Sequence, residues 1–382
     1  MSPSDPEALL ASLVSYPTVA GQPNKELVEF VRTWLAGYGV QSTIIPSSSR
    51  PDGLNIHAVI GPSAEPGVVL SAHTDVVSVD GQAWQSDPFQ LTRDGDRLYG
   101  RGTADMKGFV AAVLAIVPYA VTRPLRRPVH IALSCDEELG CRGVGTLLDL
   151  LDAAPTRPAL CIVGEPTEMR VADRHKGKVG MAVSVHGRAG HSSSAPSAVN
   201  AVTYAARLII AIDELGVGLA RAATDPGFGV PHATLSIGPI RGGVSTNIVP
   251  DACSFEFELR YLPGQDPEPI LDEVQARAGS LEDEMRASAL EAGIEFRRAT
   301  AYPPLAAMPL PATLPSPLQG APIAVDFGTE AGLYRERLGI PVLVCGPGNM
   351  AQAHRANEYL EVDQLGRACG FLRSLVDDLC VA

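Results

Sequence analysis

Two histidines and three carboxylates of this sequence lie in segments where their side chains could meet and do chemistry. Imidazole nitrogens and carboxylate oxygens form a mixed ligand set that suits borderline cations such as zinc, cobalt or manganese. No thiolate accompanies them, so the set does not indicate a structural zinc site. The expected ligands are His73, Asp105, Glu138, Glu165 and His354.

The charge of this ligand set favours two metal ions over one. Three clustered carboxylates would repel one another strongly, and two divalent cations would offset that charge. With five protein ligands for two ions, one carboxylate must be shared, which leaves an open position for a bridging water that becomes a nucleophile. Glu137 is adjacent to a ligand but left over, and is the expected proton shuttle. Asp75 is expected to accept the other imidazole N–H of His73.

The elements that must position these residues are short apolar strands that alternate with helices. Runs of this kind are typical of strands buried on both faces, and their alternation with helices predicts an α/β layer with a largely parallel sheet. Ligands of such sheets bind beyond the carboxyl ends of the strands, which is where most of the expected ligands lie. The predicted strands are Val68–Ala72, Val129–Ser134, Ala159–Val163 and Pro341–Cys345, with a helix over Asp105–Val121 between the first two.

The middle of the chain has a different pattern, because apolar and polar residues alternate as in half-exposed antiparallel strands. The order of elements is β-α-β-β-α-β, that of a ferredoxin-like unit. The sequence therefore predicts an inserted α+β domain at 178–300 within a discontinuous α/β domain formed by 1–177 and 301–382. The second part of that α/β domain begins with a proline-rich loop, Pro303–Pro322.

Composition and charge exclude several classes of protein. The 382 residues are 46% hydrophobic and 19% charged, which is typical of a globular enzyme with more than one domain. A net charge of −13 disfavours a nucleic-acid partner. The seven cysteines form no C-x-x-C pair and indicate buried thiols in a reducing compartment. No leader pattern and no apolar run approaching about 18 residues is evident, so a cytoplasmic protein without a membrane partner is expected.

Several motifs surround the expected ligands and recur elsewhere along the chain, namely Ser71–Val77, Tyr99–Gly108, Asp136–Gly140, Gly164–Thr167, Gly190–Ser193, Gly328–Gly332 and Cys345–His354. They resemble those of the acetylornithine deacetylase and succinyl-diaminopimelate desuccinylase family of dinuclear zinc metallopeptidases, which also contains aminoacylase and glutamate carboxypeptidase. The resemblance covers nearly the whole chain and is greatest to the acetylornithine deacetylase branch. It implies a zinc-peptidase catalytic domain with a mixed, largely parallel sheet between helices, and an inserted ferredoxin-like α+β domain for dimerisation or as a lid.

The resemblance also implies a role for each matching residue. One ion would be held by His73, Asp105 and Glu165, and the other by Asp105, Glu138 and His354, with Glu137 as general base and a cis peptide after Asp105. His191 of the small domain would reach the active site of the partner subunit in a homodimer and stabilise the oxyanion. Asn247 and Arg260 match positions that bind the substrate and its α-carboxylate. The alternative for Arg260 is an ion pair with Glu256 or Glu258.

The expected reaction is hydrolysis of an N-acyl amino acid, and N2-acetyl-L-ornithine is the first candidate. Thr329 and Glu330 of the glycine-rich loop are expected substrate contacts, with Glu330 facing the side-chain ammonium. A desuccinylase remains open, because a second substrate carboxylate could be bound by Arg174, His175, Lys176 or Lys178. A broader aminoacylase or dipeptidase would use the same metals with a different pocket. A binding protein without activity would be expected to lack a ligand or the base, and none is missing.

Overall fold

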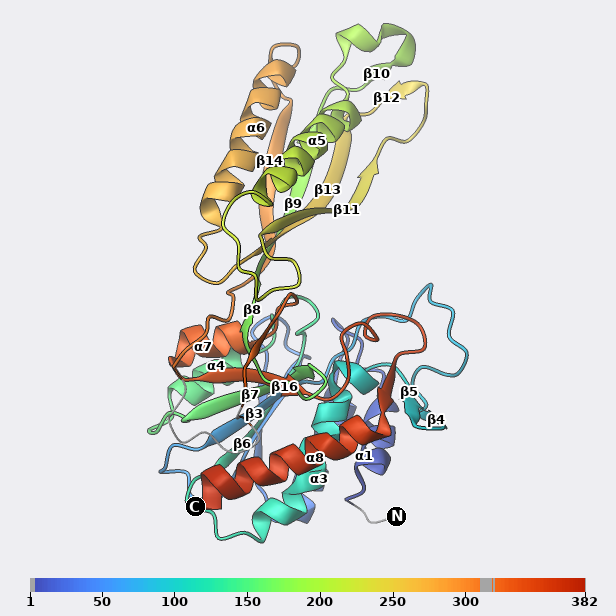
Figure 1. Ribbon diagram of the computed structural model, residues 1–382. Helices are drawn as coiled ribbons and strands as arrows, with labels where there is room; N and C mark the ends of the chain where they lie inside the picture. Colours follow the sequence, from blue (N-terminus) through green and yellow to red (C-terminus); the bar gives the residue numbers. More distant parts are fainter. Residues whose placement is uncertain (1–3, 310–317, 319, 382) are drawn as a thin grey trace. The chain divides into compact units, whose positions relative to one another are not determined.

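The computed structural model describes residues 4–309, 318 and 320–381, and the chain divides into two compact units (Figure 1). Unit 1 comprises the chain up to Arg174, Leu305–Ala324 and the chain from Thr329 on, and unit 2 comprises His175–Pro304 and Val325–Gly328. Unit 2 is thus slightly wider than the expected 178–300. The expected proline-rich loop over 303–322 lies partly outside the described residues.

Unit 1 is built on an eight-stranded sheet in which the four strands predicted from the sequence are confirmed and are neighbours. β6, β3, β7 and β16 run parallel in that order, so their carboxyl ends meet at one edge. Antiparallel strands extend the sheet at both sides, so the sheet is mixed and largely parallel, as expected. In sheet order the strands are β1 (Ser42–Pro46), β2 (Leu54–Ile60), β6 (Val129–Ser134), β3 (Val68–His73), β7 (Leu160–Pro166), β16 (Val342–Gly346), β8 (Ala172–His175) and β15 (Ile323–Val325).

Helices cover both faces of this sheet (Figure 1). One face carries α1 (Pro6–Val14), α2 (Lys25–Gly37), α3 (Gly108–Val121) and α8 (Val362–Val376), and the other carries α4 (Gly145–Asp152) and α7 (Ala331–Leu338). The stretch Thr103–Val121 is long and apolar enough to cross a membrane, but 83% of its apolar 18-residue window is buried inside the protein. It is therefore accounted for as the core helix of this layer. A small sheet of β4 (Thr92–Asp94), β5 (Arg97–Tyr99) and β17 (Tyr359–Glu361) contacts α8 through β17.

The segment before α3 differs from the helix that the sequence predicts over Asp105–Val121. Thr103–Lys107 forms an irregular turn in which Asp105 and Met106 have non-helical backbone angles, and the peptide bond between these two residues is cis. Regular helix begins at Gly108. A Cβ at Gly108 would lie 2.5 Å from the carbonyl oxygen of Thr103, so only glycine allows the helix to start this close to the turn. Asp105 is thus presented on the turn and not on the helix.

Unit 2 has the ferredoxin-like order that the sequence predicts. Its antiparallel sheet has the order β11-β13-β9-β14, and two helices that contact each other pack on it. Side chains along β13 alternate between buried and exposed, as expected for a sheet with one covered face. The elements are β9 (Gly177–His186), α5 (Ala201–Leu219), β11 (Thr234–Gly242), β13 (Ala252–Tyr261), α6 (Glu268–Arg286) and β14 (Gly293–Tyr302), with a two-stranded ribbon of β10 (Gly190–His191) and β12 (Ile248–Val249).

Candidate metal centre and active site

The carboxylate of Asp105 lies between the two histidines of the expected ligand set. His73 Nε2 is 3.0 Å from Asp105 Oδ1, and His354 Nε2 is 3.1 Å from Asp105 Oδ2. Each imidazole therefore faces a different oxygen of one carboxylate, which is the arrangement needed for a ligand shared by two ions. His73 and Asp105 are almost fully buried, whereas the His354 side chain is 49% exposed. The Asp105 carboxylate thus lies between a buried histidine and a partly exposed one.

Each of the two remaining candidate ligands lies near one of these histidines. Glu165, in β7, has Oε1 3.7 Å from His73 Nε2. Glu138, in the loop after β6, has Oε2 3.1 Å from His354 Nε2. Both carboxylates come from segments that follow or end parallel strands, because the carboxyl ends of β6, β3 and β7 lie at the same edge of the sheet. All five side chains that the sequence singled out are brought together here.

Burial of several carboxylates in one place perturbs their pKa values in the metal-free protein. Burial first, and then the charge of Asp105, raises the pKa of Glu138 and raises that of Glu165 well above its ordinary value. The pKa of Asp105 shifts the other way: burial opposes the charge, but hydrogen bonds from His354 and His73 outweigh it and lower the pKa. Hydrogen bonds to Asp105 and Glu138 raise the pKa of His354 to about 10.

These donors fit divalent cations. Among the described residues, two groups of three donors have ligand atoms that all lie within 4.8 Å of one another, namely His73, Glu137 and Glu165, and His73, Asp105 and Glu138. The donors are nitrogen and oxygen atoms only, which suits zinc, cobalt or manganese. Buried carboxylates that repel one another are stabilised when a cation takes the place of the protons. The donor set therefore has the chemistry of a metal centre.

The loop after β6 is held by Asp75. Its two carboxylate oxygens accept hydrogen bonds from the backbone N–H groups of Glu137 and Glu138, each at 3.1 Å. The expected contact with His73 is different: Nδ1 lies 2.9 Å from the backbone carbonyl of Asp75 and 3.6 Å from its carboxylate. Because the carboxylate is directed to the loop, the backbone carbonyl holds the imidazole. Asp75 thus fixes both a ligand and the candidate base.

Burial raises the pKa of Glu137 to about 8 in the metal-free protein, and the charges of Glu138 and Glu330 act in the same direction. A carboxyl group with such a pKa is suited to exchanging protons near neutral pH. Glu137 is the neighbour of a candidate ligand and lies within 4.8 Å of His73 and Glu165. Its position is therefore that of a general base beside the donor cluster.

A buried ion pair that the sequence reading missed supports the turn that carries Asp105. Glu358 and Arg101 are each 1% exposed and lie 2.6 Å apart. The Glu358 carboxylate also accepts hydrogen bonds from the backbone N–H groups of Gly102, Ala104 and Asp105 at 3.1, 2.9 and 3.1 Å. Arg101 lies in the motif that contains Asp105, which is the signal that could have indicated a structural charge. Its partner is remote in sequence, so no spacing rule reveals it.

Two further expected substrate residues lie at the start of α7. Thr329 is fully buried, and its hydroxyl accepts a hydrogen bond from the Ala331 N–H at 2.9 Å. Glu330 is 1% exposed, and its Oε1 atom has no hydrogen-bond partner among the described residues. Burial raises the pKa of Glu330 to about 7. Glu330 thus combines a buried carboxylate with an unpartnered oxygen.

The expected substrate residues of unit 2 are held by local contacts. His191 is exposed, and its Nδ1 lies 2.8 Å from the hydroxyl of Ser193. Asn247 is exposed as well, and its Oδ1 accepts a hydrogen bond from Ser245 at 2.6 Å. The ribbon of β10 and β12 pairs His191 with Ile248. Asn247 directly precedes Ile248, so it is close to His191.

Arg260 forms the ion pair that the sequence offered as the alternative. Its Nε atom donates to Glu258 at 2.8 Å, and Nη1 donates to the hydroxyl of Tyr302 at 2.7 Å. The same Glu258 carboxylate is 2.8 Å from Lys178 Nζ. A substrate carboxylate would therefore meet an arginine whose orientation is already fixed.

The cations that a desuccinylase would need are engaged within the protein. Lys178 pairs with Glu258, and Lys176, 2% exposed, donates to the backbone carbonyl of His232 at 2.9 Å and lies 3.4 Å from Asp326. His175 is fully buried, with Nδ1 2.9 Å from a backbone carbonyl. Arg174 lies 3.4 Å from Asp173. Each cation of this group thus has a partner within its own unit, as Arg260 does.

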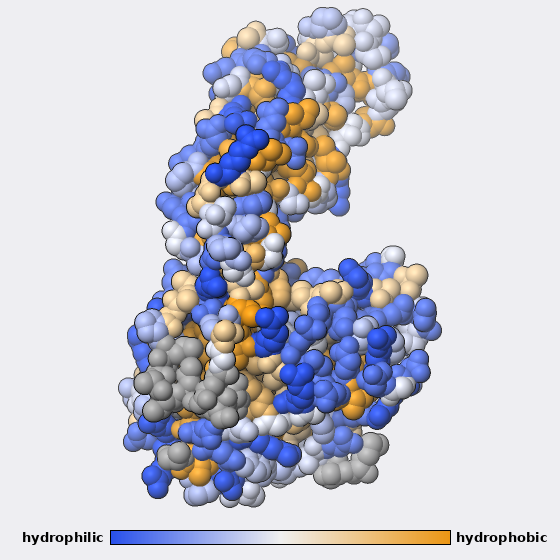
Figure 2. Space-filling model, viewed as in Figure 1, coloured by the Kyte–Doolittle hydropathy of each residue, from blue (hydrophilic) through white to orange (hydrophobic). Residues whose placement is uncertain are grey.

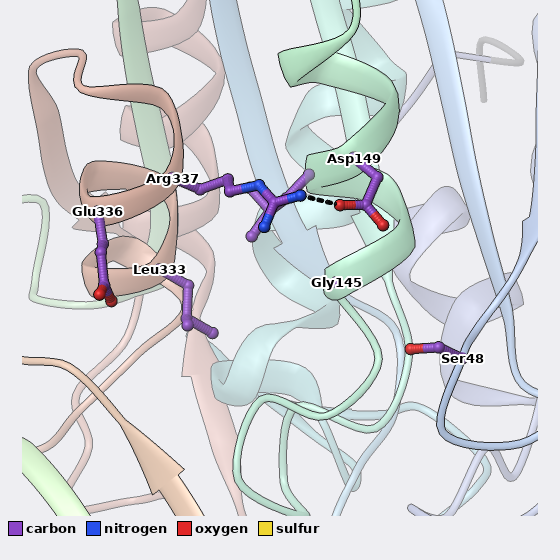
Figure 3. A pocket seen from close by; sticks show the side chains of 7 residues that line it. Ser48, Gly145, Asp149, Leu333, Glu336 and Arg337 are labelled. Carbon is purple, nitrogen blue, oxygen red and sulfur yellow. Dashed lines mark hydrogen bonds and ion pairs between the residues drawn. The ribbon is translucent and has the colours of Figure 1, made fainter.

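One pocket of unit 1 is lined by residues of which none is a candidate ligand (Figure 3). It has a volume of about 510 Å³ and lies between α4 and α7, where Arg337 is paired with Asp149. Its described lining is Ser48, Gly145, Leu148, Asp149, Leu333, Glu336 and Arg337, so none of the candidate ligands belongs to it. This pocket is therefore not part of the donor cluster.

Solved structures with the same fold confirm the expected architecture. A metallo-carboxypeptidase of the M20 family from Sulfolobus solfataricus has a TM-score of 0.78 and 17% identity, with 98% of this chain and 99% of that chain covered. A dinuclear metal-binding peptidase of the M20 family from Bacillus subtilis has a TM-score of 0.63 and 14% identity, with 97% and 96% covered. At these identities the likeness establishes the fold.

The family is established by sequence. The family model described as peptidase family M20/M25/M40 matches residues 69–378, a span that holds every candidate ligand. Fold and sequence together define a metal-dependent hydrolase that acts on amide bonds. The chain belongs to peptidase family M20/M25/M40.

Among curated relatives, the chain is similar to acetylornithine deacetylases. It is 32% identical to the enzyme of Myxococcus xanthus, with 98% of this chain and 97% of that protein covered. It is 29% identical to the enzyme of Pasteurella multocida, with 97% of each covered. The resemblance inferred from the motifs is thus confirmed at the level of the family.

Proposed function

We propose that this chain hydrolyses N2-acetyl-L-ornithine to L-ornithine and acetate. The observation that carries the reaction is the cluster in which Asp105 faces His73 on one side and His354 on the other, with Glu137 beside it. The substrate is supported by the similarity over nearly the full chain to acetylornithine deacetylases. That reaction would place the protein in arginine biosynthesis, and its buried free cysteines favour the reducing cytoplasm.

Two divalent ions would be held by the donor cluster, with zinc as the first candidate and cobalt or manganese as alternatives. His73, Asp105 and Glu165 are the proposed ligands of one ion, and Asp105, Glu138 and His354 those of the other. When bound, the ions supply Lewis acidity that polarises the acyl carbonyl and eases deprotonation of water.

Proton transfer is the proposed role of Glu137. Its carboxylate takes a proton from the attacking water and returns it to the nitrogen of the departing amine, so one group serves as base and then as acid. Asp75 supports this step, because it holds the backbone N–H groups of both Glu137 and Glu138 and thereby fixes the base relative to a ligand. No covalent intermediate with the protein is required.

Recognition of the substrate is assigned to residues of both units. Arg260, assisted by Asn247, binds the α-carboxylate, because a guanidinium offers two parallel donors to a carboxylate. Thr329 contributes a further contact. Glu330 is proposed to meet the side-chain ammonium, since its unpartnered Oε1 atom lacks a described hydrogen bond that a cationic group would supply. His191 stabilises the oxyanion that develops on the acyl group, by donating a hydrogen bond from its imidazole.

A homodimer formed through unit 2 is part of this proposal. Hydrophobic residues gather on the surface of this unit along α5 and β11 (Figure 2). Ile210 and Val217 on α5 are 59% and 61% exposed, and Ile240 on β11 is 51% exposed. β11 is also an edge strand of its sheet. An edge strand flanked by exposed apolar side chains is a surface that pairing with a second copy would cover. His191 would then act in the site of the partner subunit.

The test is steady-state deacylation after the purified protein has been stripped with a chelator and reconstituted with zinc or cobalt. N2-acetyl-L-ornithine, N-succinyl-diaminopimelate and N-acetylmethionine are compared, with Glu137→Ala as the inactive control. The proposal expects metal-dependent turnover that is fastest with acetylornithine. Preference for either other substrate would retain the reaction and reject the substrate, and absence of metal binding would reject the mechanism.

A further inference from the structure

A thiol lies against the proposed base. The Sγ atom of Cys141 is 3.3 Å from Oε1 of Glu137, within the range of a hydrogen bond from sulfur. The loop produces this contact, because the backbone N–H groups of Gly140 and Cys141 both donate to the carbonyl of Glu137, at 2.8 and 2.7 Å. Cys141 also has a φ of 58°, in the left-handed region that a non-glycine residue rarely adopts. The turn therefore directs the thiol back to the residue four positions earlier.

When Glu137 is ionised, as the proposed base must be, the thiol is the donor in this contact. A carboxylate offers acceptor atoms, and S–H is a weak donor. Cys141 is 5% exposed, and burial raises the pKa of its thiol well above the ordinary value, so the proton stays on sulfur. Asp75 fixes the backbone of Glu137, but the side chain retains three rotatable bonds beyond it. The contact with Cys141 supplies a restraint at the carboxylate itself.

On the basis of the proposed function, we infer that Cys141 is a positioning residue that orients the carboxylate of Glu137 for proton transfer. With Oε1 engaged by the thiol, Oε2 is the oxygen that takes the proton from water and delivers it to the leaving amine. Such a restraint acts on the rate of the chemical step and not on binding of substrate or metal.

The experiment compares Cys141→Ala and Cys141→Ser with the wild type, each as the zinc-reconstituted full chain. Cys135→Ala is the matched control, since Cys135 is a buried free cysteine of the same segment. Loss of one weak hydrogen bond is expected to lower kcat of Cys141→Ala about 3- to 10-fold with KM within about 2-fold. The hydroxyl of Cys141→Ser retains a donor, so kcat should recover to within about 2-fold of the wild type. Metal content and thermal midpoint are measured for every variant.

An unchanged kcat in Cys141→Ala would overturn the inference. Equal losses in Cys141→Ser and Cys141→Ala would also overturn it, because the residue would then only fill space. A fall in kcat that follows a fall in bound zinc, or that Cys135→Ala reproduces, would assign Cys141 a structural role instead. If the wild type showed no metal-dependent hydrolysis, the proposed function would fail and the inference with it, whereas an active wild type with an indifferent Cys141 rejects the inference alone.

Discussion

The two units hold their candidate functional residues in opposite ways. In unit 1 most of these residues are buried, with His354 as an exposed exception. They are fixed by partners far away in sequence, as with Asp105, whose turn is held by Glu358. In unit 2, His191 and Asn247 are exposed and are fixed by serines two positions away. The fold as a whole therefore determines the geometry in unit 1, and a short ribbon determines it in unit 2.

This difference has an electrostatic side. Burial in unit 1 places carboxylates where their charge is costly, which raises the pKa values of Glu137 and Glu330 to about 8 and about 7. Such a site is preorganised for cations and is destabilised without them. Exposed side chains such as His191 remain in contact with water. Their electrostatic interactions become stronger only when a partner or substrate excludes that water. Five predictions test this contrast, from the largest expected effect to the smallest.

The largest effect is expected for Glu137→Gln in unit 1. The amide keeps the size of the side chain but cannot accept the proton of water, so kcat should fall by about 10² to 10⁴-fold. Bound zinc should be unchanged, because Glu137 is not a proposed ligand. Glu336→Gln, an exposed glutamate on α7, is the control and should retain full activity. An unchanged kcat for Glu137→Gln would remove it as the base.

In unit 2, His191→Ala is expected to lower kcat by about 10²-fold without changing bound zinc, since one oxyanion donor is lost. His186→Ala is the matched control, because His186 is an exposed histidine of the same unit. If His191→Ala released metal, the contrast between the units would be wrong.

A mixing experiment then tests whether His191 acts across a dimer. Glu137→Gln and His191→Ala subunits are inactive or nearly so when alone. If His191 serves the partner subunit, equal mixing and reassociation should restore about a quarter of the wild-type activity, since half of the dimers are hybrids with one intact site each. No recovery, with subunit exchange demonstrated by a tag on one variant, would place His191 in its own subunit or outside the reaction.

The sequence predicted much of unit 1 because its signals are local. Apolar runs buried on both faces revealed β3, β6, β7 and β16, and the polar residues at their ends marked the edge where ligands meet. The metal candidates were therefore found without the structure. Glu358 was missed because its role depends on a contact with Arg101 and with a turn more than 250 positions away in sequence, as the separation of 257 for the ion pair shows. Neither residue has a periodicity or spacing that indicates this.

The buried ion pair of Glu358 and Arg101 predicts a moderate loss of zinc affinity in Glu358→Gln. The amide cannot accept all the N–H groups that hold the turn, and it leaves Arg101 buried without its counter-charge. The turn that presents Asp105 should loosen, and zinc affinity should fall about 10- to 100-fold. Competition with a chromogenic chelator measures this. Glu361→Gln, a half-buried glutamate nearby in the chain, should leave the affinity unchanged. Equal zinc affinity in Glu358→Gln would show that the ion pair is not needed for the metal centre.

The smallest effect is expected in the pH dependence of the metal-free protein. The pKa of Glu330 is about 7 in the folded state and 4.5 in the reference state, so this group favours folding at low pH. That stability is fully present below pH 4.5 and is lost as the pH rises through about 7. The full pKa shift of Glu330 corresponds to about 3 kcal/mol of unfolding free energy as an upper bound.

Urea unfolding of metal-free protein at pH 5 and pH 8 should therefore show lower stability at pH 8. Glu330→Gln, which cannot ionise, should reduce this difference, whereas Glu336→Gln should preserve it. A Glu330→Gln protein with the wild-type pH dependence would show that the buried carboxylate is not charged at pH 8. The electrostatic contrast between the two units would then rest on the metal ligands of unit 1 alone.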